Sequence, residues 1–142
     1  MKTLEFLNYE YPIYPPSILL IGDDASRALK LKRKLEHHGL RVYQTDVSAD
    51  ELAPARQKYF ELIVFDIKQL DANNCEVCRK IKADPELADI PMVILTTRNL
   101  TQETLKPLNV GTPVSYLSRD DSAEERLIRI VEHRHYMTYR YI

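Results

Sequence analysis

Short apolar runs that stop at polar residues constrain the fold of this chain more than any other feature. Such runs occupy 18–21, 62–65 and 92–95, and each contains four residues that favour burial. An apolar run of this length is typical of a strand covered on both faces, as in a parallel sheet. The run at 62–65 ends on a single carboxylate, Asp66. In an open parallel sheet, ligands and chemistry collect at the carboxyl ends of the strands, so Asp66 is the first candidate site residue.

Helical patterns separate these runs and give the chain an alternating plan. Expected strands cover 18–21, 41–45, 62–66, 92–95 and 115–117, and expected helices cover 26–39, 50–58, 75–82, 101–109 and the residues from 122 onward. Pro107 is expected to break the fourth helix, because proline lacks a backbone donor. Strand and helix alternate five times, which predicts a doubly wound α/β fold with helices on both faces of a parallel sheet.

The first helix has recognisable ends. Ser26 is expected to cap its start through the side-chain hydroxyl, and Gly39 is expected to stop it. The pattern of apolar residues predicts an inner side that consists of Ala28, Leu29, Leu31 and Leu35.

Composition bounds the class of protein. The 142 residues suffice for one domain with a sizeable core, and we expect an N-terminal extension at 1–16 followed by a domain at 17–142 with a C-terminal helix and tail. The formal net charge of −1 gives no reason to expect nucleic acid or a membrane as a partner. No run approaches the ~18 apolar residues of a membrane span. Two cysteines make no disulfide framework, so the sequence predicts a cytoplasmic protein.

Polar side chains at the ends of the expected strands form one constellation. Asp23 and Asp24 follow the first strand, Asp66 ends the third, Thr96 follows the fourth, and the fifth is followed by Arg119. Together with the stretches ILLIGDD, ELIVFD, EVCRKIKADPELADIPMVILTT and YLSR, this order and spacing resemble the receiver domain of two-component response regulators. The resemblance extends over most of the chain, from the first strand into the last helix.

The resemblance implies a flavodoxin-like fold, with a five-stranded parallel sheet in the order 2-1-3-4-5. It also implies that Asp66 accepts a phosphoryl group from a histidine kinase or a phosphotransfer protein, and that the chain is a signalling domain and not an enzyme. Magnesium, which prefers hard oxygen ligands, would be held by Asp23, Asp66 and the backbone carbonyl of Lys68. Asp24 is a further candidate ligand.

In that family, a hydroxyl and a cation respond to the charge of the added phosphoryl group, and the resemblance places Thr96 and Arg119 in these positions. Tyr116 stands at the position of the family's aromatic switch. The switch would reshape a face built by the fourth helix, the fifth strand and the fifth helix. This face would bind an effector domain or a second copy of the chain.

Two departures from the family pattern concern the charges of the site. Gly22 stands where the first acid of the family's acidic pair falls, so magnesium is expected to bind more weakly than in a receiver with both acids. Arg119 replaces the family's lysine. The planar guanidinium of arginine favours bidentate binding of a carboxylate. We therefore expect an ion pair between Arg119 and Asp66 that exists before any phosphate arrives and that lowers the pKa of Asp66.

Two other functions compete with the receiver hypothesis. A standing ion pair is compatible with a pseudo-receiver, which binds a protein partner without phosphoryl chemistry. An enzyme on the same fold lacks support, because the chain has only three glycines and no glycine-rich loop that would cradle a phosphate.

Overall fold

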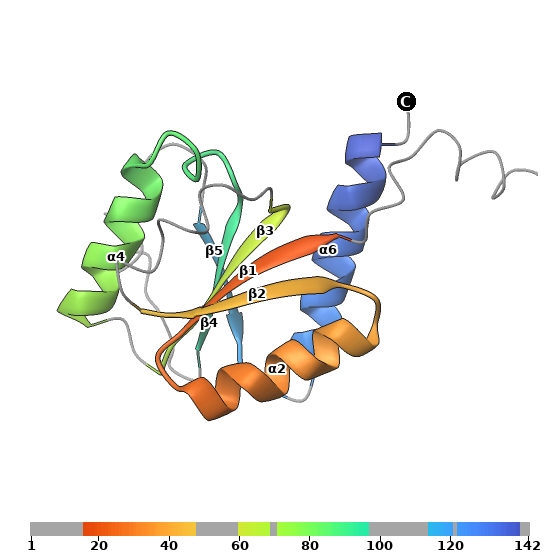
Figure 1. The fold of residues 1–142 in the computed structure, drawn as a ribbon, viewed down its shortest axis with the longest axis horizontal. Helices are drawn as coiled ribbons and strands as arrows, with labels where there is room; N and C mark the ends of the chain where they lie inside the picture. Colours follow the sequence, from red (N-terminus) through yellow and green to blue (C-terminus); the bar gives the residue numbers. More distant parts are fainter. Residues whose placement is uncertain (1–15, 48–59, 69–70, 97–113, 121, 140–142) are drawn as a thin grey trace, which may run out of the picture.

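The computed structural model describes residues 16–47, 60–68, 71–96, 114–120 and 122–139. Five strands form one parallel sheet in the order β2-β1-β3-β4-β5 (Figure 1). The strands are β1 (Ser17–Gly22), β2 (Arg41–Asp46), β3 (Leu62–Asp66), β4 (Met92–Thr96) and β5 (Val114–Ser118). The predicted strands and the predicted order 2-1-3-4-5 are confirmed.

Three helices lie in the described part of the chain: α2 (Ala25–His37), α4 (Ala72–Ala83) and α6 (Ala123–Tyr139). They correspond to the first, third and fifth predicted helices. The predictions for 50–58 and 101–109, including the break at Pro107, concern residues outside the described ranges. None of the three described helices combines the length and the apolar character that crossing a membrane requires.

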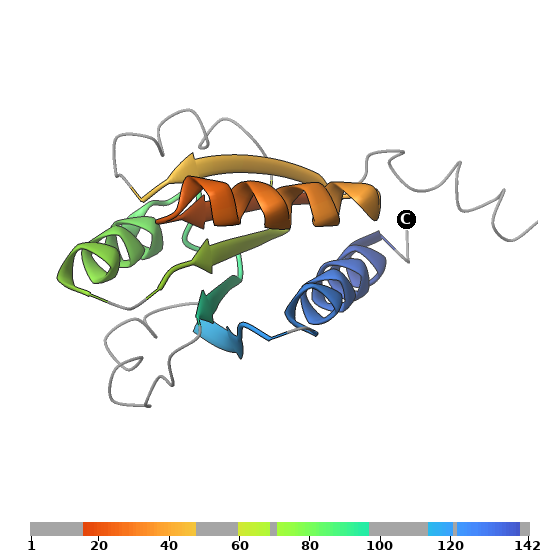
Figure 2. The ribbon, with the colours of Figure 1, turned by 90° about the horizontal axis from the view of Figure 1, so that it is seen from below.

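The sheet separates two apolar cores, because successive side chains of a strand point to opposite faces. On one side, α4 covers a core that contains Leu19, Ile21, Ile63, Phe65, Val77, Cys78, Ile81 and Ile94. On the other side, α2 and α6 cover a core that contains Ile18, Leu20, Leu62, Val64, Ala28, Leu35, Leu127 and Val131. Figures 1 and 2 show α4 and α6 on opposite sides of the sheet, so the prediction of helices on both faces is confirmed.

The start of α2 differs from the sequence prediction. Asp24 is the N-cap: its backbone is extended (φ −136°, ψ 108°), and its Oδ1 accepts a hydrogen bond from the Arg27 backbone N–H at 3.0 Å. Ser26 lies inside the first turn, so the prediction that it caps the helix is wrong. Gly39, with a φ of 84°, follows the helix end as predicted.

The inner side of α2 is narrower than predicted. Ala28 and Leu35 are buried, and Leu31 packs against the same core as a partly buried residue. Leu29 is 38% exposed, so the prediction that it faces inward is wrong. Ala28 and Leu35 are seven residues apart and lie on one side of the helix, and a residue directly after Ala28 is turned away from that side.

The register of the sheet brings the carboxyl ends of its strands to one edge. Gly22 pairs with Asp66 across β1 and β3, and Thr96 pairs with Ser118 across β4 and β5. The residues that directly follow these strands therefore lie close to Asp66.

Candidate functional site

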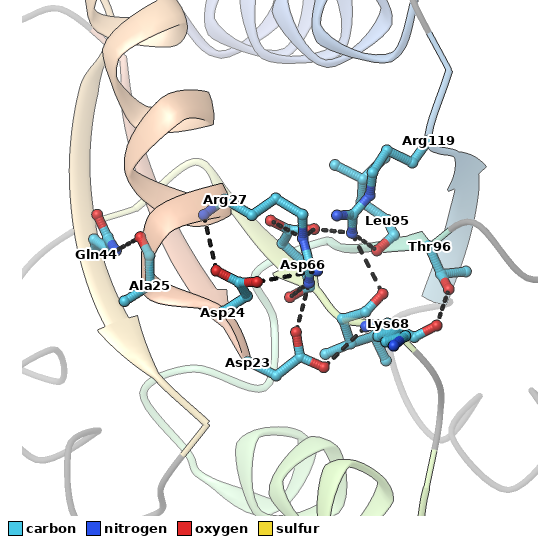
Figure 3. A network of polar contacts seen from close by, with 11 residues as sticks. Asp23, Asp24, Ala25, Arg27, Gln44, Asp66, Lys68, Leu95, Thr96 and Arg119 are labelled. Atoms are coloured by element: carbon cyan, nitrogen blue, oxygen red, sulfur yellow. Dashed lines mark hydrogen bonds and ion pairs between the residues drawn. The ribbon is translucent and has the colours of Figure 1, made fainter.

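Asp66, the last residue of β3, lies at the centre of a polar network at this edge of the sheet (Figure 3). Its side chain is fully buried, at 0% exposure. Its backbone carbonyl accepts a hydrogen bond from the Asp23 N–H at 3.2 Å, which ties the end of β1 to the end of β3. A buried carboxylate requires partners, because an unpaired buried charge is strongly destabilising.

Arg119 supplies one of these partners. It directly follows β5, and its backbone N–H donates to the Thr96 carbonyl at 2.9 Å. Its Nη2 donates to Oδ1 of Asp66 and, at 2.9 Å, to the backbone carbonyl of Leu95. The predicted ion pair between Arg119 and Asp66 is confirmed.

The ion pair does not bring the pKa of Asp66 below its ordinary value, so that part of the prediction is wrong. Burial raises the pKa of Asp66, and this effect exceeds the lowering by the positive charges of Arg119 and Arg27. Burial likewise lowers the pKa of Arg119, against the raising effect of Asp66. Burial therefore disfavours the charged forms of both Asp66 and Arg119, and their mutual attraction offsets only part of this effect.

The raised pKa of Asp66 predicts how stability depends on pH. A group with a higher pKa in the folded state stabilises the fold below its unfolded pKa, 3.8 here, and loses that contribution as the pH rises. Asparagine imitates the neutral form, so we expect Asp66→Asn to gain stability relative to wild type as the pH rises above 3.8. Urea unfolding of both proteins at several pH values measures this difference. A relative gain for wild type with rising pH would show instead that the arginines outweigh burial.

Arg27, in the first turn of α2, is a second cation of the site, and the sequence reasoning missed it. Its Nη2 donates to Oδ1 of Asp23 at 2.5 Å, and its Nε lies 3.4 Å from Oδ1 of Asp66, so one guanidinium bridges two carboxylates (Figure 3). The predicted site residues lie in strands or follow them, whereas Arg27 reaches the site from a helix. The signal that could have found it is the spacing of four residues between Asp23 and Arg27, at which acid and base pair near a helix start.

Backbone and hydroxyl groups complete the network. The Lys68 N–H donates to Oδ2 of Asp23 at 2.9 Å, and Thr96 Oγ1 donates to the Lys68 carbonyl at 3.1 Å. Thr96 is buried, whereas the Lys68 side chain is exposed. The structure thus brings together the predicted site residues Asp23, Asp66, Lys68, Thr96 and Arg119.

Two predicted site residues contribute less directly. Asp24 caps α2, and the hydrogen bond from the Arg27 backbone N–H lowers the pKa of its exposed carboxyl. Tyr116, on β5, is 44% exposed. Their predicted roles as a metal ligand and as a switch stay predictions, and the 101–109 part of the switch face lies outside the described residues.

The oxygen atoms expected to hold Mg²⁺ have suitable chemistry but are already engaged. Both carboxylate oxygens of Asp23 accept hydrogen bonds, one from Arg27 and one from the Lys68 N–H. Asp66 is paired with Arg27 and Arg119. In the described ranges, no group of three or more His, Cys, Asp or Glu side chains is placed to hold a metal ion. A guanidinium stands between the two carboxylates, so the arrangement as described does not fit the ion.

Gly22 is closely packed at the end of β1. A Cβ added there would approach the Cβ of Ala28 to 3.0 Å, which is tighter than ordinary packing, and the Asp66 carbonyl oxygen to 3.5 Å. An acid at this position, as in the family pattern, therefore requires a small shift of α2. The predicted weakening of metal binding by Gly22 stays a prediction.

Comparisons with known proteins agree with the fold. No protein-family model matches the sequence. Protein PilH of Pseudomonas aeruginosa is 34% identical over 89 residues, which are 63% of this chain and 72% of PilH. Response regulator ArlR of Staphylococcus aureus is 29% identical over 113 residues, or 80% of this chain. The aligned region is only 50% of ArlR, so the chain spans about half the length of that relative.

Among solved structures, the receiver domain of the sensor histidine kinase PA1611 from Pseudomonas aeruginosa has a TM-score of 0.66 and 21% sequence identity. The match covers 85% of this chain and 98% of that domain. The PA1611 domain contains a magnesium ion coordinated in its active site cleft. At 21% sequence identity, the similarity to the PA1611 domain supports the fold of this chain.

Proposed function

This chain belongs to the receiver domains of two-component response regulators, and we propose that Asp66 is the side chain on which it accepts a phosphoryl group. The observation that carries the proposal is the burial of Asp66 at the carboxyl end of the central strand β3, between two guanidinium groups. A carboxylate at this edge of the sheet can act as a nucleophile once the guanidinium groups release its oxygen atoms, and the same cations can then neutralise the charge that arrives with the phosphoryl group.

The proposed donor is a phosphohistidine of a histidine kinase or of a phosphotransfer protein. One carboxylate oxygen of Asp66 forms a bond to phosphorus while the N–P bond of the donor breaks, and the electron pair stays on the imidazole nitrogen, which takes up a proton from solvent. Arg119 and Arg27 lie close enough to Asp66 to contact the oxygens of the transferred group. Thr96, which donates to the Lys68 carbonyl, can redirect its hydroxyl to the same oxygens.

The proposed output is a change on the face that β5 and α6 contribute to. Tyr116 exposes an amphipathic ring there, and such residues often anchor protein contacts. An effector domain or a second copy of the chain is the proposed partner, with 1–16 as an extension to the domain at 17–142. Dependence on a histidine kinase is the reason to propose a cytoplasmic location.

Phosphoryl transfer to Asp66 can be tested directly by intact mass measurement. Wild type incubated with acetyl phosphate and Mg²⁺ is expected to gain the mass of one phosphoryl group, and Asp66→Asn is expected to gain none, because the amide is not a nucleophile. Asp89→Asn is the matched control and should label like wild type, since Asp89 is an exposed acid just before β4, at the opposite edge of the sheet.

The outcome of this labelling separates the two remaining functions. Labelling of Asp66→Asn at the wild-type rate would place the acceptor on another residue. No labelling of folded wild type by either acetyl phosphate or a phosphorylated histidine kinase would favour the pseudo-receiver, which binds its partner without phosphoryl chemistry.

A further inference from the structure

Arg27 occupies the space between the two acids that the family pattern assigns to a metal ion. Its Nη2 lies 2.5 Å from Oδ1 of Asp23, and its Nε lies 3.4 Å from Oδ1 of Asp66. The same Nη2 is 3.4 Å from the Asp66 backbone carbonyl. One guanidinium thus contacts four oxygen atoms: Oδ1 of Asp23, and both carboxylate oxygens and the backbone carbonyl of Asp66.

We propose that Arg27 is a tethered cation that takes the place of a divalent ion in the resting site, so that metal binds only when Arg27 leaves Asp23. The inference rests on the proposed function, because it concerns the same acidic site. It adds a residue that controls access to that site and that the family pattern does not assign.

The charges of the site support this role. Asp23, Asp24 and Asp66 supply three negative charges, and Arg27 and Arg119 supply two positive charges, so the cluster carries a single net negative charge. A divalent ion added to this cluster would make it positive overall. Removal of Arg27 would leave two net negative charges, which a divalent ion matches.

The contacts of Arg27 are suited to exchange. Its side chain is 28% exposed, its contact to Asp66 is long, and its partner Asp23 is 26% exposed, so water and ions reach the pair. Arg119 differs, since its side chain is only 19% exposed and also donates to the Leu95 carbonyl. The more exposed of the two arginines is therefore the one that can leave.

A cavity beside the site can accommodate the Arg27 side chain after it leaves Asp23. It has a volume of about 460 Å³, lies between α2 and α6, and is lined by Arg27, Asp66, Asp120 and Glu124 among others. Within the described ranges, Oε2 of Glu124 accepts no hydrogen bond, although it lies 3.7 Å from Nζ of Lys34. Oε2 of Glu124 is thus a carboxylate acceptor in the wall of the cavity that Arg27 also lines.

Calorimetric titration with Mg²⁺, without any phosphodonor, tests this proposal on the full chain. Arg27→Gln is expected to bind Mg²⁺ about tenfold more tightly than wild type, because it removes one positive charge from between the acids. Arg33→Gln is the matched control: the same substitution on an exposed position of α2, with an expected change of less than about twofold. Equal or weaker Mg²⁺ binding by folded Arg27→Gln would overturn the proposal.

A second measurement needs no variant. In wild type, the NMR signal of the Arg27 Nε–H group is expected to shift as Mg²⁺ saturates the site, while the Arg33 signal stays in place. A signal of Arg27 that is unchanged at saturating Mg²⁺ would also overturn the proposal, and this readout remains if Arg27→Gln does not fold.

These experiments are independent of phosphoryl transfer. Tighter Mg²⁺ binding by Arg27→Gln together with no labelling of Asp66 would support the tethered cation and reject the proposed function. Labelling of Asp66 together with unchanged Mg²⁺ binding by Arg27→Gln would support the proposed function and reject the tethered cation.

Discussion

The double variant Arg27→Gln/Arg119→Lys is expected to accept a phosphoryl group from acetyl phosphate at least about tenfold faster than wild type. In wild type, Arg119 Nη2 donates to Oδ1 of Asp66 and Arg27 lies within 3.4 Å of the same oxygen. A lone pair held by guanidinium groups is less available for attack on phosphorus. Lysine keeps a positive charge near the site, but its compact ammonium can move aside. Intact mass measurement at a series of times gives the two rates.

Single variants identify which arginine limits the reaction. Arg27→Gln and Arg119→Lys are each expected to accelerate labelling less than the pair together, since either remaining guanidinium still contacts Asp66. Adding Asp66→Asn to the double variant should abolish labelling. Wild type that already labels as fast as the double variant would show that neither arginine hinders Asp66.

Gly22→Asp would restore the acid of the family pattern, and it is the alternative partner for Arg119→Lys in such a double variant. The structure places a Cβ at Gly22 only 3.0 Å from the Cβ of Ala28 and places Arg27 between the acids. Removing Arg27 therefore frees the site without forcing α2 to shift.

The fold was predictable because its signal is local and strong. Runs such as 62–65 and 92–95 are apolar on both faces, and only a covered parallel strand accommodates such runs between helices. The positions of the site residues followed from the same rule, since parallel strands end at one edge of the sheet. The proximity of Asp66 and Arg119 could therefore be predicted from the sequence.

What could not be predicted depends on side-chain direction and on burial. Asp24 and Ser26 are both good caps, and only the extended backbone of Asp24 decides between them. Arg27 reaches the site because the first turn of α2 stands beside Asp23, which spacing suggests but does not prove. The pKa of Asp66 has the opposite direction from the prediction because a sequence lists charged neighbours but not the loss of water around a buried carboxylate.

The pairing of Asp66 with Arg119 also leads to the largest expected effect on stability. Arg119→Met keeps a long side chain but removes the charge. Among the described residues, it leaves Arg27, at a long distance, as the remaining cation beside the fully buried Asp66. Breaking a buried pair by removing one partner costs about 3 kcal/mol or more, because the other charge stays buried. We expect a loss of unfolding free energy of about this size near neutral pH, measured by urea denaturation.

A surface pair in the same part of the fold provides the matched control for that loss. Nη2 of Arg126 lies 3.4 Å from Oδ2 of Asp120, and the two side chains are 44% and 48% exposed. Arg126→Met is therefore expected to cost less than about 1 kcal/mol. Asp66→Asn added to Arg119→Met should recover most of the loss, since no unpaired carboxylate remains buried. A loss in Arg119→Met that Asp66→Asn does not recover would mean that Arg119 stabilises the fold through its bonds to backbone carbonyls, such as that of Leu95, and not through the ion pair.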